Sequence, residues 1–190
     1  MKQAVFALAT LFFATQAQAH SPVLTNGTAA MSKANPYEIE DPEHSKAIFS
    51  TLTSEAHYYR ITSDVSFEFY VGITAPKNES CGLSRSFSFD VLNENFEKLD
   101  GRDGHNFDWW AWYEEWGKKW YWVGPEIGKD FKADRIYEAG TYYIKVFNEE
   151  NVGKYVLAVG DIERFGLRDI FTMRKKVKEI NAEYWDESDC

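Results

Sequence analysis

Hydrophobic and polar residues alternate along much of the chain between residues 44 and 165. The longest regular alternation covers nine residues, with apolar side chains at Val65, Phe67, Phe69, Val71 and Ile73. Residues 56–62 and 87–91 alternate in the same way, and residues 46–53 form a short apolar stretch. A period of two places every second side chain on the same face of an extended segment, so these segments are predicted to be β-strands.

Two further strands are predicted at residues 140–147 and 154–160, joined as a hairpin by the polar loop 148–153. Short runs of β-branched and aromatic residues separated by turn residues are typical of antiparallel sandwiches. No long helical segment alternates with these strands, which disfavours a parallel α/β sheet. The predicted fold is all-β: an antiparallel, jelly-roll-like β-sandwich over residues 44–165.

The segment 1–19 has the pattern of a secretory signal peptide. Lys2 precedes an uncharged, mostly apolar stretch over residues 4–15, and Ala17-Gln18-Ala19 has the small-x-small form of a cleavage site. We therefore expect export to the periplasm or the extracellular space, with His20 as the first residue of the mature chain.

The segments on either side of the sandwich differ from it in pattern. Residues 20–43 are rich in turn signals such as Asn35-Pro36 and Asp41-Pro42, and an irregular arm is predicted there. In the tail 166–190, apolar residues recur at helical spacing, with Lys and Arg between them: Leu167, Ile170, Phe171, Val177, Ile180 and Tyr184. This segment could form a short helix packed on the sandwich, stay a frayed and solvated tail, or lie as a helix on an anionic membrane through its basic residues.

Composition and charge narrow the classes of partner. The precursor carries a formal net charge of −9, so nucleic acid is not an expected partner. Outside residues 4–15 no apolar run approaches the ~20 residues that span a bilayer, so no transmembrane segment is expected in the mature chain. Cys81 and Cys190 are the only cysteines; a disulfide between them and a free Cys81 both remain open.

Three motifs resemble a known family: Glu55-Ala-His-Tyr-Tyr-Arg-Ile, Glu138-Ala-Gly-Thr-Tyr-Tyr-Ile-Lys-Val and Gly153-Lys-Tyr-Val-Leu-Ala-Val. Together with the strand at 65–73 they resemble the bacterial pre-peptidase C-terminal domain and its stand-alone secreted relatives. The resemblance implies a jelly-roll-like β-sandwich with a binding or processing role and no catalytic residues. It covers about residues 45–75 and 135–160, and it does not extend to the segment 95–130.

That unmatched segment contains six of the seven tryptophans, and aromatic faces of this kind stack on sugars and other apolar surfaces. As a helix it would align Trp109, Trp112, Tyr113, Trp116 and Trp120 on one face, whereas as a strand only Trp120 and Trp122 would share a face. The aromatic residues could instead be core. The candidate ligand-binding residues are Trp109, Trp110, Trp112, Tyr113, Trp116, Trp120 and Trp122.

Two metal sites are candidates. The amine and imidazole of a processed His20, with a second histidine, would give a three-nitrogen site suited to Cu(II). His57 and His105 are the candidate partners, and His44 is a weaker one. For Ca²⁺, the carboxylates of Asp100, Asp103 and Asp108 lie in a glycine-rich loop, although Asp-Gly pairs are also ordinary turn formers.

The sequence has no Gly-x-Ser-x-Gly elbow, phosphate-binding glycine loop or His-Glu-x-x-His motif. The main hypothesis is therefore an exported, non-catalytic module that binds a small molecule or glycan through its aromatic segment. A periplasmic Cu(II)-binding protein that uses His20 is one alternative. A structural or assembly protein of the cell surface, with the basic part of the tail as its contact, is another.

Overall fold

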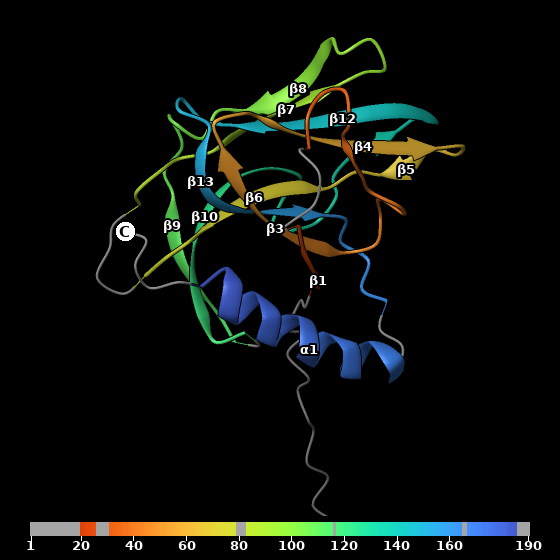
Figure 1. The fold of residues 1–190 in the computed structure, drawn as a ribbon. Coiled ribbons are helices and arrows are strands. Elements are labelled where there is room, and N and C mark those ends of the chain that lie inside the picture. Colours follow the sequence, from red (N-terminus) through yellow and green to blue (C-terminus); the bar gives the residue numbers. More distant parts are fainter. Residues whose placement is uncertain (1–19, 26–30, 79–82, 116, 165–166, 186–190) are drawn as a thin grey trace, which may run out of the picture.

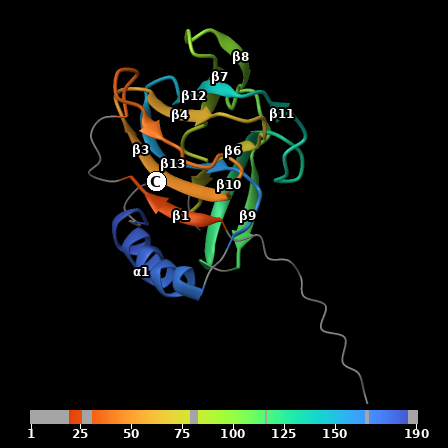
Figure 2. The ribbon, with the colours of Figure 1, turned by 90° about the vertical axis from the view of Figure 1, so that its right-hand side faces the viewer.

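The computed structural model describes residues 20–25, 31–78, 83–115, 117–164 and 167–185, and the side chains of all of these except 167–174. Three layers are visible in Figure 1: a five-stranded sheet, a six-stranded sheet beneath it, and one helix on the outer side of the six-stranded sheet. Figure 2 shows the same layers after a quarter turn. The predicted β-sandwich with a short C-terminal helix is confirmed.

The six-stranded sheet combines the first and last strands of the chain. Its strands lie in the order β1-β3-β13-β6-β10-β9. Their bounds are β1 (Ser21–Leu24), β3 (Lys46–Thr53), β13 (Val152–Val159), β6 (Val71–Pro76), β10 (Lys119–Ile127) and β9 (Trp110–Glu114). All neighbours are antiparallel except β1 and β3, which run parallel.

The five-stranded sheet has the order β2-β4-β12-β7-β8. It comprises β2 (Tyr37–Glu38), β4 (His57–Ser63), β12 (Gly140–Phe147), β7 (Ser88–Leu92) and β8 (Lys98–Arg102). Two short strands, β5 (Phe67–Glu68) and β11 (Ile136–Tyr137), pair with each other beside the sandwich.

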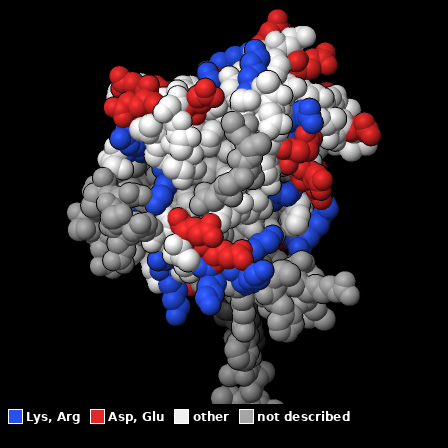
Figure 3. Space-filling view, in the orientation of Figure 1, with Lys and Arg blue, Asp and Glu red and all other residues white. Residues whose placement is uncertain are grey.

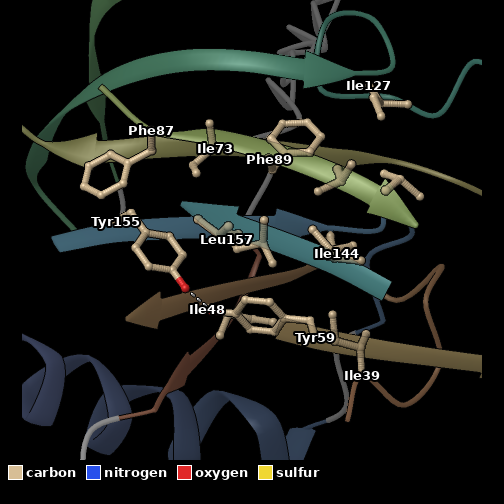
Figure 4. Packing of buried hydrophobic residues seen from close by; sticks show 14 of the residues in the cluster. Ile39, Ile48, Tyr59, Ile73, Phe87, Phe89, Ile127, Ile144, Tyr155 and Leu157 are labelled. Carbon is tan, nitrogen blue, oxygen red and sulfur yellow. Dashed lines mark hydrogen bonds between the residues drawn. The ribbon is translucent and has the colours of Figure 1, made fainter. Parts of the chain in front are cut away.

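The main core lies between the two sheets (Figure 4). Ile48, Ile73 and Leu157 face it from the six-stranded sheet, and Tyr59 and Ile144 from the five-stranded sheet, all at 1% exposure or less. The hydroxyls of Tyr59 and Tyr155 meet across this core at 2.6 Å. Because a buried hydroxyl without a partner is costly, this hydrogen bond helps to fix how the sheets face each other.

The six-stranded sheet is buried on both faces, which explains the continuous apolar run in β13. Leu157 faces the sandwich core, whereas its neighbours Val156 and Ala158 face the opposite side. Helix α1 (Leu167–Glu183) covers that outer face, and Ile180 and the following Tyr184 pack there with Phe49, Tyr121 and Val156. The helix therefore packs on the sandwich, which was one of the three alternatives for this segment.

The described residues of the segment 20–43, which are 20–25 and 31–43, are more ordered than expected. β1 continues the edge of the six-stranded sheet, and β2 pairs with β4. Met31 and Ile39 are buried in the main core. The turn residues at 35–36 and 41–42 separate short strands that neighbouring strands hold in register, so the prediction of an irregular arm was wrong in this respect.

Two predictions about strand connections were also wrong. The alternating run at 65–73 divides into β5 and β6, because the consecutive residues Phe69 and Tyr70 are both buried and Val65 is 68% exposed. The strands at 140–147 and 152–159 form no hairpin: β12 pairs with β4 and β7, whereas β13 pairs with β3 and β6 of the other sheet. The loop between them crosses from one sheet to the other.

Charges of both signs are spread over the surface. In the face shown in Figure 3, Lys and Arg gather over the region of α1, with acidic side chains among them. On α1 itself, Nζ of the exposed Lys175 lies 3.7 Å from Oε1 of Glu179. Within the described residues, no helix has the length and apolar character required to cross a membrane.

Candidate functional site

The tryptophan-rich segment is a β-hairpin. β9 and β10 pair antiparallel, with Trp112 opposite Tyr121 and Tyr113 opposite Trp120. Gly117 lies in the turn between them and follows Trp116, which is not among the described residues. The helical alignment of the aromatic residues was therefore wrong, and the strand interpretation applies.

The hairpin divides the aromatic side chains between its two faces. Residues directly opposite each other in an antiparallel pair share a face, as do residues two apart in one strand. Trp110, Trp112 and Tyr121 therefore face the helix side, whereas Tyr113, Trp120 and Trp122 face the other. The expectation that only Trp120 and Trp122 share a face missed Trp110 and Trp112.

Only part of the cluster is exposed. Trp110 is 45% exposed and Trp120 is 39% exposed, on opposite faces of the hairpin. Trp109 and Trp122 pack against the main core instead, and Trp109 Nε1 donates a hydrogen bond to the Gly104 carbonyl at 2.7 Å. Trp116 lies outside the described residues.

A cavity of about 580 Å³ lies between α1 and the outer face of the six-stranded sheet. Its floor is open because small residues line up across three neighbouring strands. The register pairs Ala158 with Ala47 on one side and with Gly72 on the other. A larger side chain at Ala47 or Ala158 would fill the space beneath the helix. At Gly72 the Tyr70 side chain takes that space, since a Cβ atom there would lie 2.6 Å from the Tyr70 hydroxyl oxygen.

Aromatic rings form the wall at the β9–β10 end of this cavity. Trp112 lies 6.0 Å from Tyr121 and 5.9 Å from Phe131, measured between ring centroids, and Tyr121 lies 5.2 Å from Trp185. All four rings line the cavity. Asp130 and Phe131 both have positive φ, 53° and 64°, a backbone conformation that is unusual outside glycine. This tight turn places the Phe131 ring against the indoles.

A few polar groups interrupt the apolar lining. At the β1 edge, the imidazole of His20 lines the cavity and its Nδ1 is hydrogen-bonded to Ser45 Oγ. Burial lowers the pKa of His20 to about 4, so the ring is neutral at pH 7. Tyr70 also lines the cavity; burial and the neighbouring Glu126 raise the pKa of its hydroxyl well above the usual value.

The structure does not bring the candidate copper ligands together. His57 Nδ1 is hydrogen-bonded to Tyr155 OH at 2.8 Å, at the start of β4 in the other sheet. His105 is exposed in the loop after β8, and His44 Nε2 faces Ser21 Oγ at 3.4 Å. In the described part of the chain, no three His, Cys, Asp or Glu residues are grouped to hold a metal ion.

The candidate calcium ligands are already engaged in protein contacts. Asp100 forms ion pairs with Arg102 at 2.7 Å and with Arg135 at 2.8 Å. Asp103 accepts hydrogen bonds from the His105 amide and the Asn106 side chain, as an aspartate does in a turn. Asp108 is exposed in the same loop. Both thiols, Cys81 and Cys190, are outside the described residues.

Of the predicted ligand-binding residues, Trp112 and Tyr113 line the cavity, although the register places the Tyr113 side chain on the opposite face of the hairpin. The predicted set omitted Tyr121, which lies between Trp120 and Trp122, and it missed Phe131 and Trp185, which lie in other segments. The small residues of the floor carried a signal: Ala158 interrupts an otherwise bulky apolar run in β13. That signal acquires meaning only once the strand register is known.

Comparison with known proteins adds little to this picture. No family model and no curated protein matches the chain. A solved structure, the catalytic domain of a GH87 α-1,3-glucanase in complex with nigerose, is similar at 12% sequence identity and a TM-score of 0.31. The match covers 61% of this chain, which spans only 22% of that structure. A likeness at this level carries no argument about activity.

Proposed function

We propose that this protein is an exported, non-catalytic binding module that holds a small apolar or amphipathic ligand beneath α1. The observation that carries the proposal is the cavity of about 580 Å³, with small residues on its floor and four aromatic rings at one end. Ligand sites are typically concave and apolar, with a few polar groups that orient the ligand. This cavity has that composition.

The cavity is a better candidate than the exposed tryptophans. A flat platform for a glycan requires aromatic faces that lie side by side. Trp110 and Trp120, the two most exposed indoles among the described residues of the hairpin, face opposite sides of it. Rings that do lie together, those of Trp112, Tyr121 and Phe131, line the cavity instead. We therefore assign the ligand to the cavity and not to an open aromatic surface.

Export and the family relationship are part of the proposal. The signal-peptide pattern at 1–19 supports export. The resemblance to the pre-peptidase C-terminal domain supports a binding role and is compatible with the β-sandwich, although β12 and β13 belong to different sheets.

Binding of 1-anilinonaphthalene-8-sulfonate to the chain 20–190 tests the proposal. We expect one saturable site per molecule, with energy transfer from tryptophan because Trp112 and Trp185 line the cavity. Ala158→Leu should weaken this binding at least tenfold, since the added carbon atoms project from the floor into the cavity.

Ala111→Leu is the matched control. Ala111 is exposed and, opposite Trp122, it lies on the face of the hairpin that is turned away from the cavity. Its substitution should leave binding unchanged, and urea midpoints should show that both variants are folded. Equal affinity in the wild type and in Ala158→Leu would refute the proposed site.

A further inference from the structure

The cavity extends across the whole six-stranded sheet. Every strand contributes to its lining, from Pro22 on β1 at one edge to Trp112 on β9 at the other. Neighbouring strands are spaced about 4.8 Å apart, so the five steps between these edges correspond to a length of about 24 Å. The cavity is therefore long compared with its volume.

An elongated cavity favours a ligand that is itself long. Residues from one edge of the sheet to the other line this cavity, so an occupant that contacts the whole lining must extend over about 24 Å. A single extended hydrocarbon chain has this shape.

The lining chemistry agrees with a hydrocarbon chain over most of the length. The side chains that cross the sheet between its edges are mainly apolar: Ala47, Phe49, Val156, Ala158 and Val123, with Val177 and Ile180 of α1 above them. Tyr70, Thr74 and Glu126 are polar residues on or beside these inner strands. A chain bound here would gain affinity by removing its methylene groups from water.

Polar groups at both ends indicate an amphiphile instead of a pure hydrocarbon. Glu114 and Lys119, opposite each other in the hairpin, line the β9–β10 end. At the β1 edge, the half-buried His20 lines the cavity and its Nδ1 is hydrogen-bonded to Ser45, which leaves Nε2 available to a ligand. A polar atom of a ligand would satisfy this nitrogen.

From this geometry we infer that the ligand is a single-chain amphiphile, with its hydrocarbon chain laid across the strands beneath α1 and its polar atom at His20. This inference rests on the proposed function and narrows its ligand class. Two classes of compound contain such a hydrocarbon chain: free fatty acids and lysophospholipids.

Quenching of tryptophan fluorescence by 9,10-dibromostearate tests the inference, since bromine quenches an indole only at close range. We expect saturable quenching through Trp112 and Trp185, displaced by stearate. In a series of saturated fatty acids, affinity should rise about fourfold per methylene until the chain fills the cavity. Ala158→Leu should abolish the quenching and Ala111→Leu should not.

Further arms of the experiment separate these two classes of compound and the rival ligand. If the site accommodates a phospholipid headgroup, lysophosphatidylcholine displaces dibromostearate as stearate does. If the site takes only the free acid, stearate displaces dibromostearate and lysophosphatidylcholine does not. His20→Leu should weaken stearate binding about five- to tenfold. Unchanged affinity in that variant would overturn the assignment of the polar atom to His20.

The two proposals fail in different ways. If the naphthalene probe binds in the cavity but dibromostearate does not quench, the chain-shaped ligand is refuted while the binding function stands. Displacement of the naphthalene probe by maltohexaose, without quenching by dibromostearate, would assign the site to a glycan. If neither probe binds, both proposals are refuted.

Discussion

Gly124 shows how one missing methyl group determines the position of an aromatic side chain. It lies in the irregular part of β10, between Val123 and Glu126, where the register with β6 shifts. A Cβ atom at this position would fall 2.4 Å from Cη2 of Trp109. The absence of a side chain therefore lets the indole of Trp109 pack flat against the strand and close the edge of the main core.

We expect Gly124→Ala to lower the free energy of unfolding by about 1–3 kcal/mol, because the indole must move from a packed position. Urea denaturation measures the change. Trp109→Phe leaves a smaller ring, so the double variant should lose less stability than the sum of the two single variants. Strict additivity would show that Gly124 and Trp109 do not compete for the same space.

Two histidines give the stability a predictable pH dependence. Burial lowers the pKa of both His20 and His57 to about 4, compared with 6.5 for an exposed histidine. Between these values the unfolded chain binds more protons than the folded one, so stability is complete above pH 6.5 and is lost as the pH falls towards 4.

The urea midpoint should therefore decrease between pH 7 and pH 4.5, and His57→Gln should make this decrease smaller. His105→Gln is the control, since His105 is exposed in a loop. A decrease of the same size in the wild type and in His57→Gln would contradict the assignment of the effect to His57.

At the level of elements, regular alternation of apolar and polar residues predicted the strands well. Which distant strands pair with each other could not be predicted from it. β3 was expected at 46–53 and has these bounds, because its apolar residues are bounded by turn residues on both sides. The β9–β10 hairpin remained undecided between helix and strand, since aromatic residues on both faces remove the period that would distinguish them. The cavity could not be predicted, because it depends on which strands become neighbours.

Helix α1 is attached to the sandwich near its C-terminal end. Ile180 is 3% exposed and packs with Phe49 and Tyr184 on the outer face of the sheet. Ile180→Ala should therefore lower the free energy of unfolding by about 2–4 kcal/mol in urea denaturation. Lys178→Ala, on the exposed side of the same turn, should change it by less than about 0.5 kcal/mol. Similar losses in both variants would show that α1 does not depend on this contact.

At the scale of the whole molecule, the two sheets are held together by apolar packing with one continuous polar path through it. Thr25, Ser50, Tyr59, Tyr155 and His57 are connected by successive side-chain hydrogen bonds. The path begins beyond β1, passes from one sheet to the other at each of its last three hydrogen bonds, and ends at the half-buried His57. Satisfied networks of this kind favour one arrangement of a core over its alternatives.

The position of β13 between β3 and β6 has a consequence for biosynthesis. Residues 46–53 and 71–76 become neighbours only through residues 152–159, so a ribosome must complete most of the chain before this sheet can close. Pairings between such distant segments form slowly, because a long loop must be ordered before any contact compensates for it. A newly made chain would thus stay unfolded for longer than a protein with local contacts, which is compatible with the export that we propose.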